Sequence, residues 1–212
     1  MSERKPIISL CDYTGNAVKP WLDAGHECWI FDTQHPRGIT REGLLVKVGA
    51  DVHELHPYHQ WMPATAYMVF AWPPCTHLAY SGARWRRKNG PRAAAMGFLT
   101  FAACWDLCRY YEHERGARWM IENPDGWVCS WCQPDYSFDP YEYGDGYTKH
   151  TNLWVGGGFV MPAKVPSLFA EQVDDRIHRC PPGPERQNIR SATPMGFANA
   201  VYEANRYGEY AS

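Results

Sequence analysis

The chain of 212 residues suits one domain with a substantial core, and its 45% hydrophobic content is near the globular average, which excludes disorder as the default. The net charge of −2 excludes a generally basic nucleic-acid coat, so any phosphate-binding surface must be local. The sequence has neither an apolar run long enough to cross a membrane nor a signal-peptide pattern. We therefore expect a cytoplasmic protein whose eight cysteines are mostly reduced.

The N-terminal part alternates strand and helix patterns. Residues 6–11 predict a strand, residues 12–16 the turn after it, and residues 18–24 a helix that ends at Gly25. Residues 27–31 predict a second strand that ends at Asp32. A strand, a glycine-bearing turn, a helix and a strand ending in an acidic residue are typical of the nucleotide-binding half of a Rossmann-like fold.

An apolar, β-prone run at residues 67–72 predicts a buried central strand. Pro73 and Pro74 cannot continue it, so Cys75 is presented at its carboxyl end, where open α/β sheets bind their ligands. A cysteine there can act as a nucleophile if nearby positive charge favours the thiolate. Taken alone, the motif is equally consistent with a buried cysteine in a rigid turn.

The middle of the chain predicts a basic loop followed by a long helix. Residues 82–92 are polar and glycine-containing, which predicts a mobile loop. Residues 93–114 predict a helix in which Cys104 and Cys108 are buried small residues rather than metal ligands. Helical spacing predicts that the face toward the sheet carries Met96, Leu99, Ala103, Leu107 and Tyr110.

The last third predicts two more strands and a C-terminal helix. Residues 118–124 predict a strand with Glu122 at its end, residues 126–146 an irregular segment over the active-site edge, and residues 147–155 a strand. Residues 156–188 predict a proline-rich linker. Thr193 can then cap a helix that has Pro194 at its first position and runs to about Asn205.

Several of these segments resemble one enzyme family. Pro73-Pro74-Cys75-Thr76, followed by Ser81-Gly82, resembles the catalytic loop of DNA cytosine-5 methyltransferases, and the chain is most similar to their short, phage-type relatives. The resemblance implies an α/β, Rossmann-like class I S-adenosylmethionine-dependent methyltransferase fold, with a mostly parallel central sheet and helices on both faces. It implies a single catalytic domain over residues 1–212: a cofactor-binding half (1–66), a catalytic half (67–155), the linker (156–188) and a C-terminal helix that closes on the cofactor site (189–212).

The resemblance also implies where S-adenosylmethionine, or a modified analogue, binds. The segment from Ser9 to Gly15 is similar to the family's cofactor loop, although Cys11 replaces an aromatic residue and Tyr13 a glycine. Ala50-Asp51-Val52 is similar to the element that contacts adenine, and Phe197-Ala-Asn-Ala-Val201 to the closing motif. Without the resemblance, Asp32 and Asp51 would each be interpreted as an ordinary turn residue at the end of a strand. The cofactor-binding residues implied are Cys11, Asp12, Tyr13, Thr14, Gly15, Asn16, Asp32, Asp51, Pro73 and Asn199.

In the mechanism that the resemblance implies, the Cys75 thiolate adds to C6 of cytosine, and Glu122, from a Glu-Asn-Pro motif similar to the family's Glu-Asn-Val, grips N3. C5 then takes a methyl or modified methyl group. Lys149 is expected to supply the family's basic contact to the base. The expected DNA-binding residues are Ser81, Arg84, Arg86, Arg87, Lys88 and Arg92. Only about forty residues separate Lys149 from the closing motif, too few for a separate target-recognition domain.

Two alternatives remain open at this point. The same chemistry could act on a free cytosine nucleotide, although the five positive charges between Arg84 and Arg92 exceed what one monophosphate needs. Alternatively, the chain could be a zinc-stabilised nucleic-acid-binding protein without catalysis, with Cys129, Cys132, His178 and Cys180 as the weak candidate ligands. The main hypothesis is an enzyme that acts on DNA containing cytosine, in the host cytoplasm if phage-encoded. It has no membrane partner and requires no protein partner, and a monomer would suffice.

Overall fold

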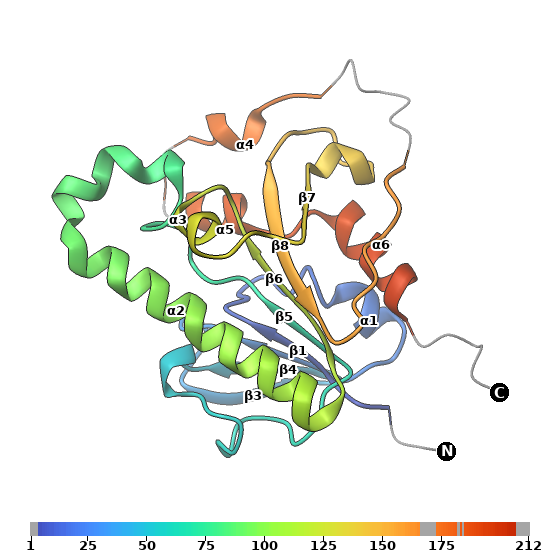
Figure 1. Ribbon diagram of the computed structural model, residues 1–212. Helices are drawn as coiled ribbons and strands as arrows, with labels where there is room; N and C mark the ends of the chain where they lie inside the picture. The colour runs from blue at the N-terminus through green and yellow to red at the C-terminus, as the bar shows by residue number, and fades with distance from the viewer. Residues whose placement is uncertain (1–3, 166–172, 182, 184, 207–212) are drawn as a thin grey trace.

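A computed structural model describes residues 4–165, 173–181, 183 and 185–206, apart from the side chains of Arg86, Arg176 and His178. An eight-stranded sheet in the order β3-β4-β2-β1-β5-β6-β8-β7 runs through the molecule (Figure 1). Five adjacent strands of this sheet are parallel: β4 (Leu45–Gly49), β2 (Cys28–Phe31), β1 (Ile7–Leu10), β5 (Met68–Ala71) and β6 (Arg118–Asn123).

Three further strands pair antiparallel at the two ends of this block. β3 (Gly38–Glu42) pairs with β4 at one end, while β8 (Thr151–Gly156) lies between β6 and β7 (Tyr136–Phe138) at the other. The parallel strands, numbered along the chain, stand in the order 3-2-1-4-5, so the winding reverses between β1 and β5. The crevice of such a sheet lies at the carboxyl ends of these two strands.

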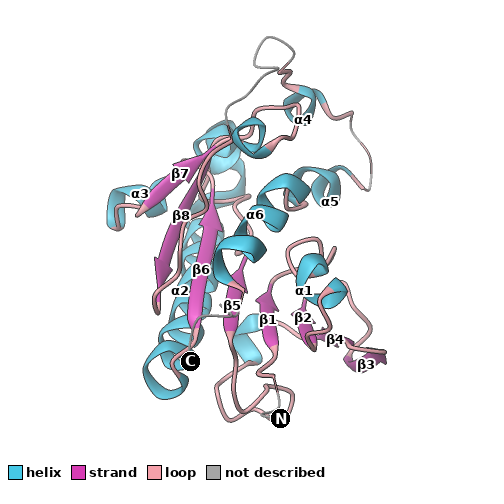
Figure 2. Ribbon diagram, turned by 90° about the vertical axis from the view of Figure 1, so that its right-hand side faces the viewer, coloured by secondary structure: helices cyan, strands magenta, loops and turns pink. Residues whose placement is uncertain are grey.

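The central strands form because both of their faces are buried. All four residues of β1 and of β5 are buried, as continuous apolar runs predict for parallel strands covered on two sides. Ile8 and Leu10 point into the core under α2 (Arg86–Arg115), while Ile7 points into the core under α1 (Lys19–Asp23) and α6 (Met195–Asn205). Helices therefore cover both faces of the sheet (Figures 1 and 2), which confirms the expected α/β, mostly parallel architecture.

The helix α2 differs from its prediction in two ways. Helical structure already begins with a 3-10 turn (Tyr80–Trp85) and continues from Arg86, with a break at Gly90 (φ 76°), so residues 82–92 are not a loop. The buried face carries Phe101, Cys104, Cys108 and Tyr111 together with Leu107, whereas Met96 and Leu99 are exposed. Of the predicted face, Leu107 is buried and Ala103 and Tyr110 are partly buried, whereas two aromatic residues and two small cysteines that were not predicted to face the sheet do so.

Three other predictions need correction. Residues 126–146 are not irregular, because they hold α3 (Trp127–Trp131), β7 and a 3-10 helix (Pro140–Tyr143). The expected linker contains α4 (Arg176–Arg179) and the start of α5 (Arg186–Ser191). The α6 helix begins at Met195, with Pro194 rather than Thr193 at the capping position.

The N-terminus of α6 receives its capping group from a distant segment. The Asp145 carboxylate accepts a hydrogen bond from the backbone N–H of Gly196 at 3.0 Å. Burial raises the pKa of Asp145, while hydrogen bonds from Gly196 and Phe197 lower it in part. A side chain at Gly196 would overlap the Tyr143 carbonyl oxygen. The close approach of these two segments sets where α6 crosses the sheet.

Candidate active site

Cys75 follows the central strand β5 at the carboxyl edge of the sheet, as the sequence predicts. It is half-buried. Its carbonyl oxygen accepts hydrogen bonds from the backbone N–H groups of Leu78 and Ala79, at 3.0 and 2.9 Å. These bonds close the chain into a turn directly after the two prolines, so the cysteine is held by a short, internally bonded loop.

The cysteine loop is also bonded to the loop that follows β6. The Asn123 side chain donates a hydrogen bond from Nδ2 to the buried carbonyl oxygen of Pro73 at 2.8 Å. Trp127 N–H donates to the Leu78 carbonyl oxygen at 3.1 Å, and a side chain at Gly126 would overlap that same oxygen. Asn123 stands in the Glu-Asn-Pro motif, in which a role is predicted only for the neighbouring Glu122. Its amide fixes the distance between the ends of β5 and β6.

Glu122 projects from the end of β6 and is 9% exposed. Its Oε1 is buried and has no hydrogen-bond partner among the described residues. The Lys149 Nζ lies 3.8 Å from this oxygen, which is an ion pair but is too long for a hydrogen bond. A buried acceptor without a donor is costly, so this oxygen is free to accept a hydrogen bond from a ligand.

Three charged side chains affect the pKa of Cys75: Glu122, Lys149 and Arg190. Burial raises the pKa of the Cys75 thiol, and the negative charge of Glu122 raises it further. The positive charges of Lys149 and Arg190 act in the opposite direction and lower the pKa. Cys75, Glu122 and Lys149 were expected to act together, whereas Arg190 was not identified. It precedes the closing motif by several residues, and nothing in its local sequence indicates that its charge acts on Cys75.

Asp12, in the loop after β1, shapes that loop. Its carboxylate accepts hydrogen bonds from Ser9 Oγ at 2.7 Å, Gly15 N–H at 2.8 Å and Thr14 Oγ1 at 3.3 Å. Burial raises its pKa, while these hydrogen bonds lower it. Gly15 has φ +71°, a conformation that favours glycine. Trp72, at the end of β5, donates from Nε1 to Ser9 Oγ at 2.9 Å, which links the expected cofactor loop to the cysteine strand.

Asp32 and Asp51 follow β2 and β4 and lie at the same sheet edge. Each accepts a backbone hydrogen bond two residues on: Asp32 from Gln34 at 2.8 Å and Asp51 from His53 at 3.0 Å. This is the turn role that the isolated residues suggest. Both carboxylates also stand close enough to Cys11 to raise its pKa, after the larger effects of its hydrogen bond with Cys104 and of burial. Acidic side chains therefore gather around the loop after β1.

The side chain of Cys11 packs into the core, whereas that of Tyr13 is exposed. Cys11 has φ +55°, and its Sγ lies 3.9 Å from Cys104 Sγ of α2, within the core. Tyr13 is 42% exposed, and its ring centroid lies 5.3 Å from that of His35. His35 is buried and its Nε2 is 3.4 Å from the Asp12 carbonyl oxygen. Of the two departures from the family loop, Tyr13 is therefore the one that offers an aromatic surface.

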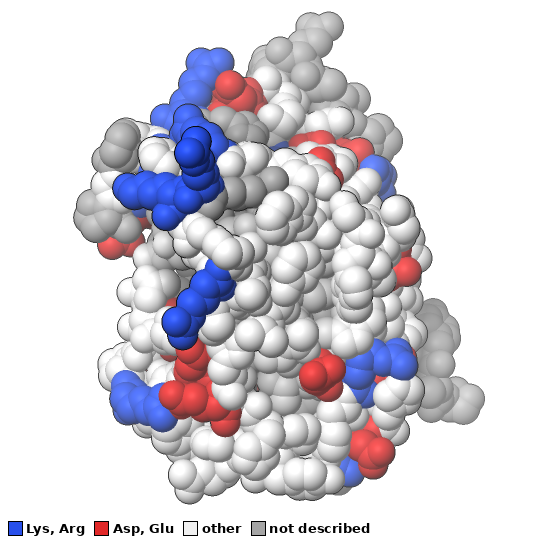
Figure 3. Space-filling model, turned by 60° about the vertical axis from the view of Figure 1, so that its left-hand side comes forward, with Lys and Arg blue, Asp and Glu red and all other residues white. Residues whose placement is uncertain are grey.

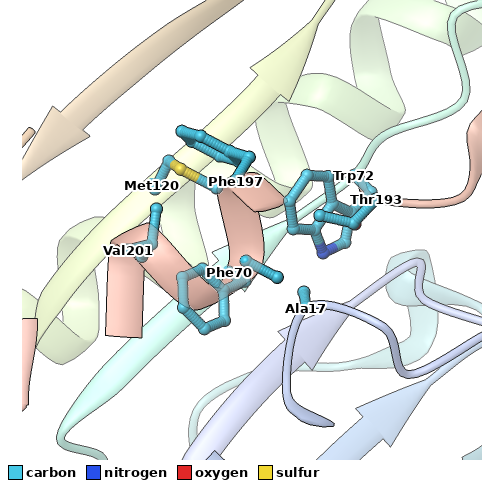
Figure 4. A pocket seen from close by; sticks show the side chains of 8 residues that line it. Ala17, Phe70, Trp72, Met120, Thr193, Phe197 and Val201 are labelled. Carbon is cyan, nitrogen blue, oxygen red and sulfur yellow. The ribbon is translucent and has the colours of Figure 1, made fainter. Parts of the chain in front are cut away.

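The C-terminal segment folds back over this edge. Asn16 Nδ2 donates to the Thr193 carbonyl oxygen at 3.2 Å, and the side-chain amides of Gln34 and Asn188 each donate to the other at 3.2 Å. A small apolar pocket opens between α6 and the sheet (Figure 4). Asn199 does not line it, because its side chain is exposed. The lining residues are Ala17, Phe70, Trp72, Met120, Thr193, Phe197, Ala198 and Val201.

The basic residues cluster where α2 begins. Ser81, Arg84, Arg87, Lys88 and Arg92 are exposed, and Figure 3 shows Lys and Arg side chains gathered at one end of this face. Arg86 belongs to the same turn, but its side chain lies outside the described part. Trp85 is 50% exposed, with the Arg84 guanidinium 5.3 Å and the Lys88 ammonium 5.8 Å from its ring centroid. The Asn89 side chain, 3.4 Å from His77, joins this turn to the cysteine loop.

The candidate zinc ligands do not form a site within the described part of the chain. There, no group of three or more His, Cys, Asp and Glu residues could hold a metal ion. Cys129 accepts a hydrogen bond from Asn152 at 3.5 Å, and Cys180 is buried. His178 could not be placed, because its side chain is outside the described residues.

No protein-family model matches the chain, and no curated protein is similar to it at a significant level. Among the helices that the structure describes, none is long and apolar enough to cross a membrane. The fold is that of an α/β protein with a mostly parallel eight-stranded sheet flanked by helices, an arrangement compatible with a Rossmann-like fold.

Proposed function

We propose that this chain transfers a one-carbon group, methyl or modified methyl, from S-adenosylmethionine or a close relative to C5 of cytosine in DNA. The observation that carries the proposal is the convergence of Cys75, Glu122 and Lys149 at the carboxyl ends of two adjacent strands, with a buried carboxylate oxygen of Glu122 unpartnered. A nucleophile beside a buried hydrogen-bonding group is what covalent activation of a ring needs.

The fold supports a cofactor at the neighbouring strand ends. The loops after β1 and β5 meet where the winding of the sheet reverses, which is where such sheets bind nucleotides. The residues present fit an adenosyl sulfonium: Asp32 can accept hydrogen bonds from a ribose diol, acidic charge favours a cation, and Tyr13 offers a ring for stacking. This agrees with the class I methyltransferase fold that the sequence resemblance implies.

Each side chain of the site has a defined task in the proposed reaction. The Cys75 thiolate attacks C6, which forms the Sγ–C6 bond and moves an electron pair toward C5. With one proton taken up from solvent and held between Glu122 and N3, the negative charge of the ring is dispersed as that proton moves to N3, and Lys149 balances the carboxylate that is then left. C5 then takes the electrophilic one-carbon group that a bound sulfonium donor would supply, and the donor would leave as its neutral thioether. Loss of the C5 proton to a base then lets the Sγ–C6 bond break, which restores the thiolate and the aromatic ring.

The resting state of the thiol fits this order of events. Because burial and, after it, the negative charge of Glu122 raise the pKa of Cys75, the thiol stays mostly protonated before substrate binds. Cytosine binding with one solvent proton held between its N3 and Glu122 offsets the negative charge of Glu122 and makes the thiolate easier to form. The nucleophile is therefore activated by binding of its own substrate.

The basic turn at the start of α2 supports a polynucleotide substrate. It adjoins the cysteine loop, combines several exposed cations with the half-exposed ring of Trp85, and suits a phosphate backbone with an unstacked base. In duplex DNA the target base must be flipped out, at a cost of a few kcal/mol.

The test is mass spectrometry of nucleosides from the DNA of cells that express the wild-type chain or Cys75→Ser. We expect a 5-substituted deoxycytidine with the wild type and none with the variant, while both purified proteins bind the donor equally. Modified DNA from the Cys75→Ser cells would refute the covalent role. Modification of added deoxycytidine monophosphate but not of DNA would favour the free-nucleotide alternative.

A further inference from the structure

The middle of α2 is apolar on its outer face as well as on the face that packs against the sheet. Residues 93–105 contain no charged side chain. Phe101 and Cys104 are buried, whereas Met96 is 44% and Leu99 54% exposed. A surface helix ordinarily places polar residues on its solvent side, and a stretch that is apolar all round is ordinarily covered on all sides. The outer face of α2 therefore has the composition of an interaction surface.

The exposed side chains of this part of α2 form one stripe with Leu99 at its middle. They recur at intervals of three and four residues, which place them on the same side of an α-helix. Figure 3, which brings the α2 side of the molecule forward, shows a broad area without charged side chains. The stripe begins and ends with a charged residue and consists of Arg92, Ala95, Met96, Leu99, Ala102 and Asp106.

The ring of Trp131 extends this surface beyond α2. Trp131 lies on α3 and is 65% exposed. Its ring centroid is 6.4 Å from that of Phe101 and 6.0 Å from that of Trp105, so the ring packs against the flank of α2. Single exposed apolar residues are common on protein surfaces, but here two adjacent elements expose several of them together.

The two charges that end the stripe are complementary to each other. Arg92 and Asp106 each stand seven residues from Leu99, one before it and one after it. Neither forms an ion pair with another described residue. If two copies of α2 pack antiparallel about a two-fold axis at Leu99, Arg92 of each copy meets Asp106 of the other. The same symmetry sets each Met96 opposite an Ala102, a long side chain against a small one. A parallel pair would instead set like charges against each other.

We propose that the outer face of α2 binds a second copy of this chain, with the two helices antiparallel about Leu99. The inference does not depend on the proposed function. An isologous interface requires a surface that is complementary to itself, and the order of charges along this stripe meets that requirement. Burial of Leu99, Met96 and Trp131 supplies the affinity. The exposed ion pairs add little affinity but fix the orientation and register of the two helices.

The size of the surface sets the expected strength of the dimer. One helix face with a flanking indole ring lies at the low end of the range for specific interfaces, about 1,000–1,200 Å² in total. We therefore expect a dissociation constant of roughly 1–50 µM rather than a permanent dimer.

The test is sedimentation velocity of the purified full chain at concentrations from about 1 to about 200 µM, over which wild type should shift from monomer to dimer. Leu99→Glu sets two carboxylates against each other at the axis and should raise the dissociation constant at least roughly thirtyfold. Leu44→Glu is the control, because it makes the same change at a leucine that is 45% exposed in the turn between β3 and β4. This control should leave the dimer unchanged.

An exchange of charges tests the orientation of the two copies. Arg92→Glu alone, or Asp106→Arg alone, places like charges together in both pairs and should weaken the dimer roughly tenfold. The double variant restores opposite charges and should return the dissociation constant to within about threefold of the wild-type value. A defect in folding, or an interface on another face, would not be corrected by the second change.

Three results would overturn the proposal. Wild type that stays monomeric at about 200 µM would leave this face to a different partner. A dimer that Leu99→Glu leaves intact, or that Leu44→Glu weakens equally, would place the interface elsewhere. A double variant that dimerises no better than the single variants would exclude the antiparallel arrangement. Thermal unfolding at about 1 µM checks that each variant keeps its fold, since changes at exposed positions should move Tm by only about 2 °C. If Leu99→Glu does not fold, the exchange of charges decides alone.

Discussion

Asn123 offers a direct test of how the cysteine loop is held, because its amide is the only side-chain donor to the Pro73 carbonyl among the described residues. The change Asn123→Ala leaves that buried oxygen without a partner, at a cost of about 1–3 kcal/mol. It also removes Oδ1, which is buried and unpartnered, and this offsets part of the loss. We expect a net destabilisation of about 1–2 kcal/mol, or a fall in Tm of roughly 2–8 °C for a chain of this length.

Asn123→Asp keeps the shape of the side chain and makes the effect depend on pH. A neutral Asp carboxyl can donate its proton to the Pro73 oxygen, but an ionised one directs negative charge at that oxygen and lies next to Glu122 in sequence. Its pKa in the folded state must therefore lie above the unfolded value of about 3.9. The folded state then binds more protons than the unfolded state, so stability relative to wild type falls as pH rises above about 4.

The assay is thermal unfolding of wild type and both variants from pH 4 to pH 8, with turnover measured at 20 °C. Asn199→Ala, a change of an exposed amide on α6, is the control for stability and should alter it by less than about 0.5 kcal/mol. Turnover of Asn123→Ala should fall by roughly tenfold to hundredfold, because the cysteine loop is no longer fixed. A destabilisation of Asn123→Asp that did not vary with pH would refute the role of the hydrogen bond.

Three further changes test other parts of the site. Glu122→Gln should lower kcat by roughly 10²–10⁴-fold with little change in KM. It should nevertheless speed alkylation of Cys75 at neutral pH, because a charge that raises the pKa of the thiol is gone. Slower alkylation would contradict this electrostatic link. Gly196→Ala should lower stability by about 1–3 kcal/mol in thermal unfolding, because the new methyl group overlaps the Tyr143 carbonyl; an unchanged Tm would show that α6 can shift freely. Trp85→Ala should weaken binding of single-stranded DNA by about 1–3 kcal/mol in anisotropy titrations and leave binding of deoxycytidine monophosphate unchanged. Equal losses of binding free energy for both ligands would instead place Trp85 inside the nucleotide site.

The sequence alone predicted those strands and helices whose ends are marked by an apolar run, a glycine or a proline at the same place in the chain. The first strand, the helix that ends at Gly25 and the strand before Pro73 were all predicted within a few residues, because apolar runs, glycine and proline act on the backbone where they stand. The position of Cys75 after the central strand followed from these signals. The hairpin of β3 and β4 was not predicted, since β3 is mostly exposed and lacks an apolar pattern.

The tertiary structure decided which strand ends meet and which side chains face them. The ion pair of Lys149 with Glu122 exists because β8 returns antiparallel beside β6, and no local pattern specifies that pairing. The positive charge of Arg190 affects the pKa of Cys75 only because amide contacts fold the C-terminal segment over the loops after β1 and β2. The same is true of the outward position of Asn199, since the rotation of α6 is set by Asp145 and by close packing at Gly196. A motif specifies residues along one segment, whereas a catalytic group acts through distances between segments, and only packing determines those.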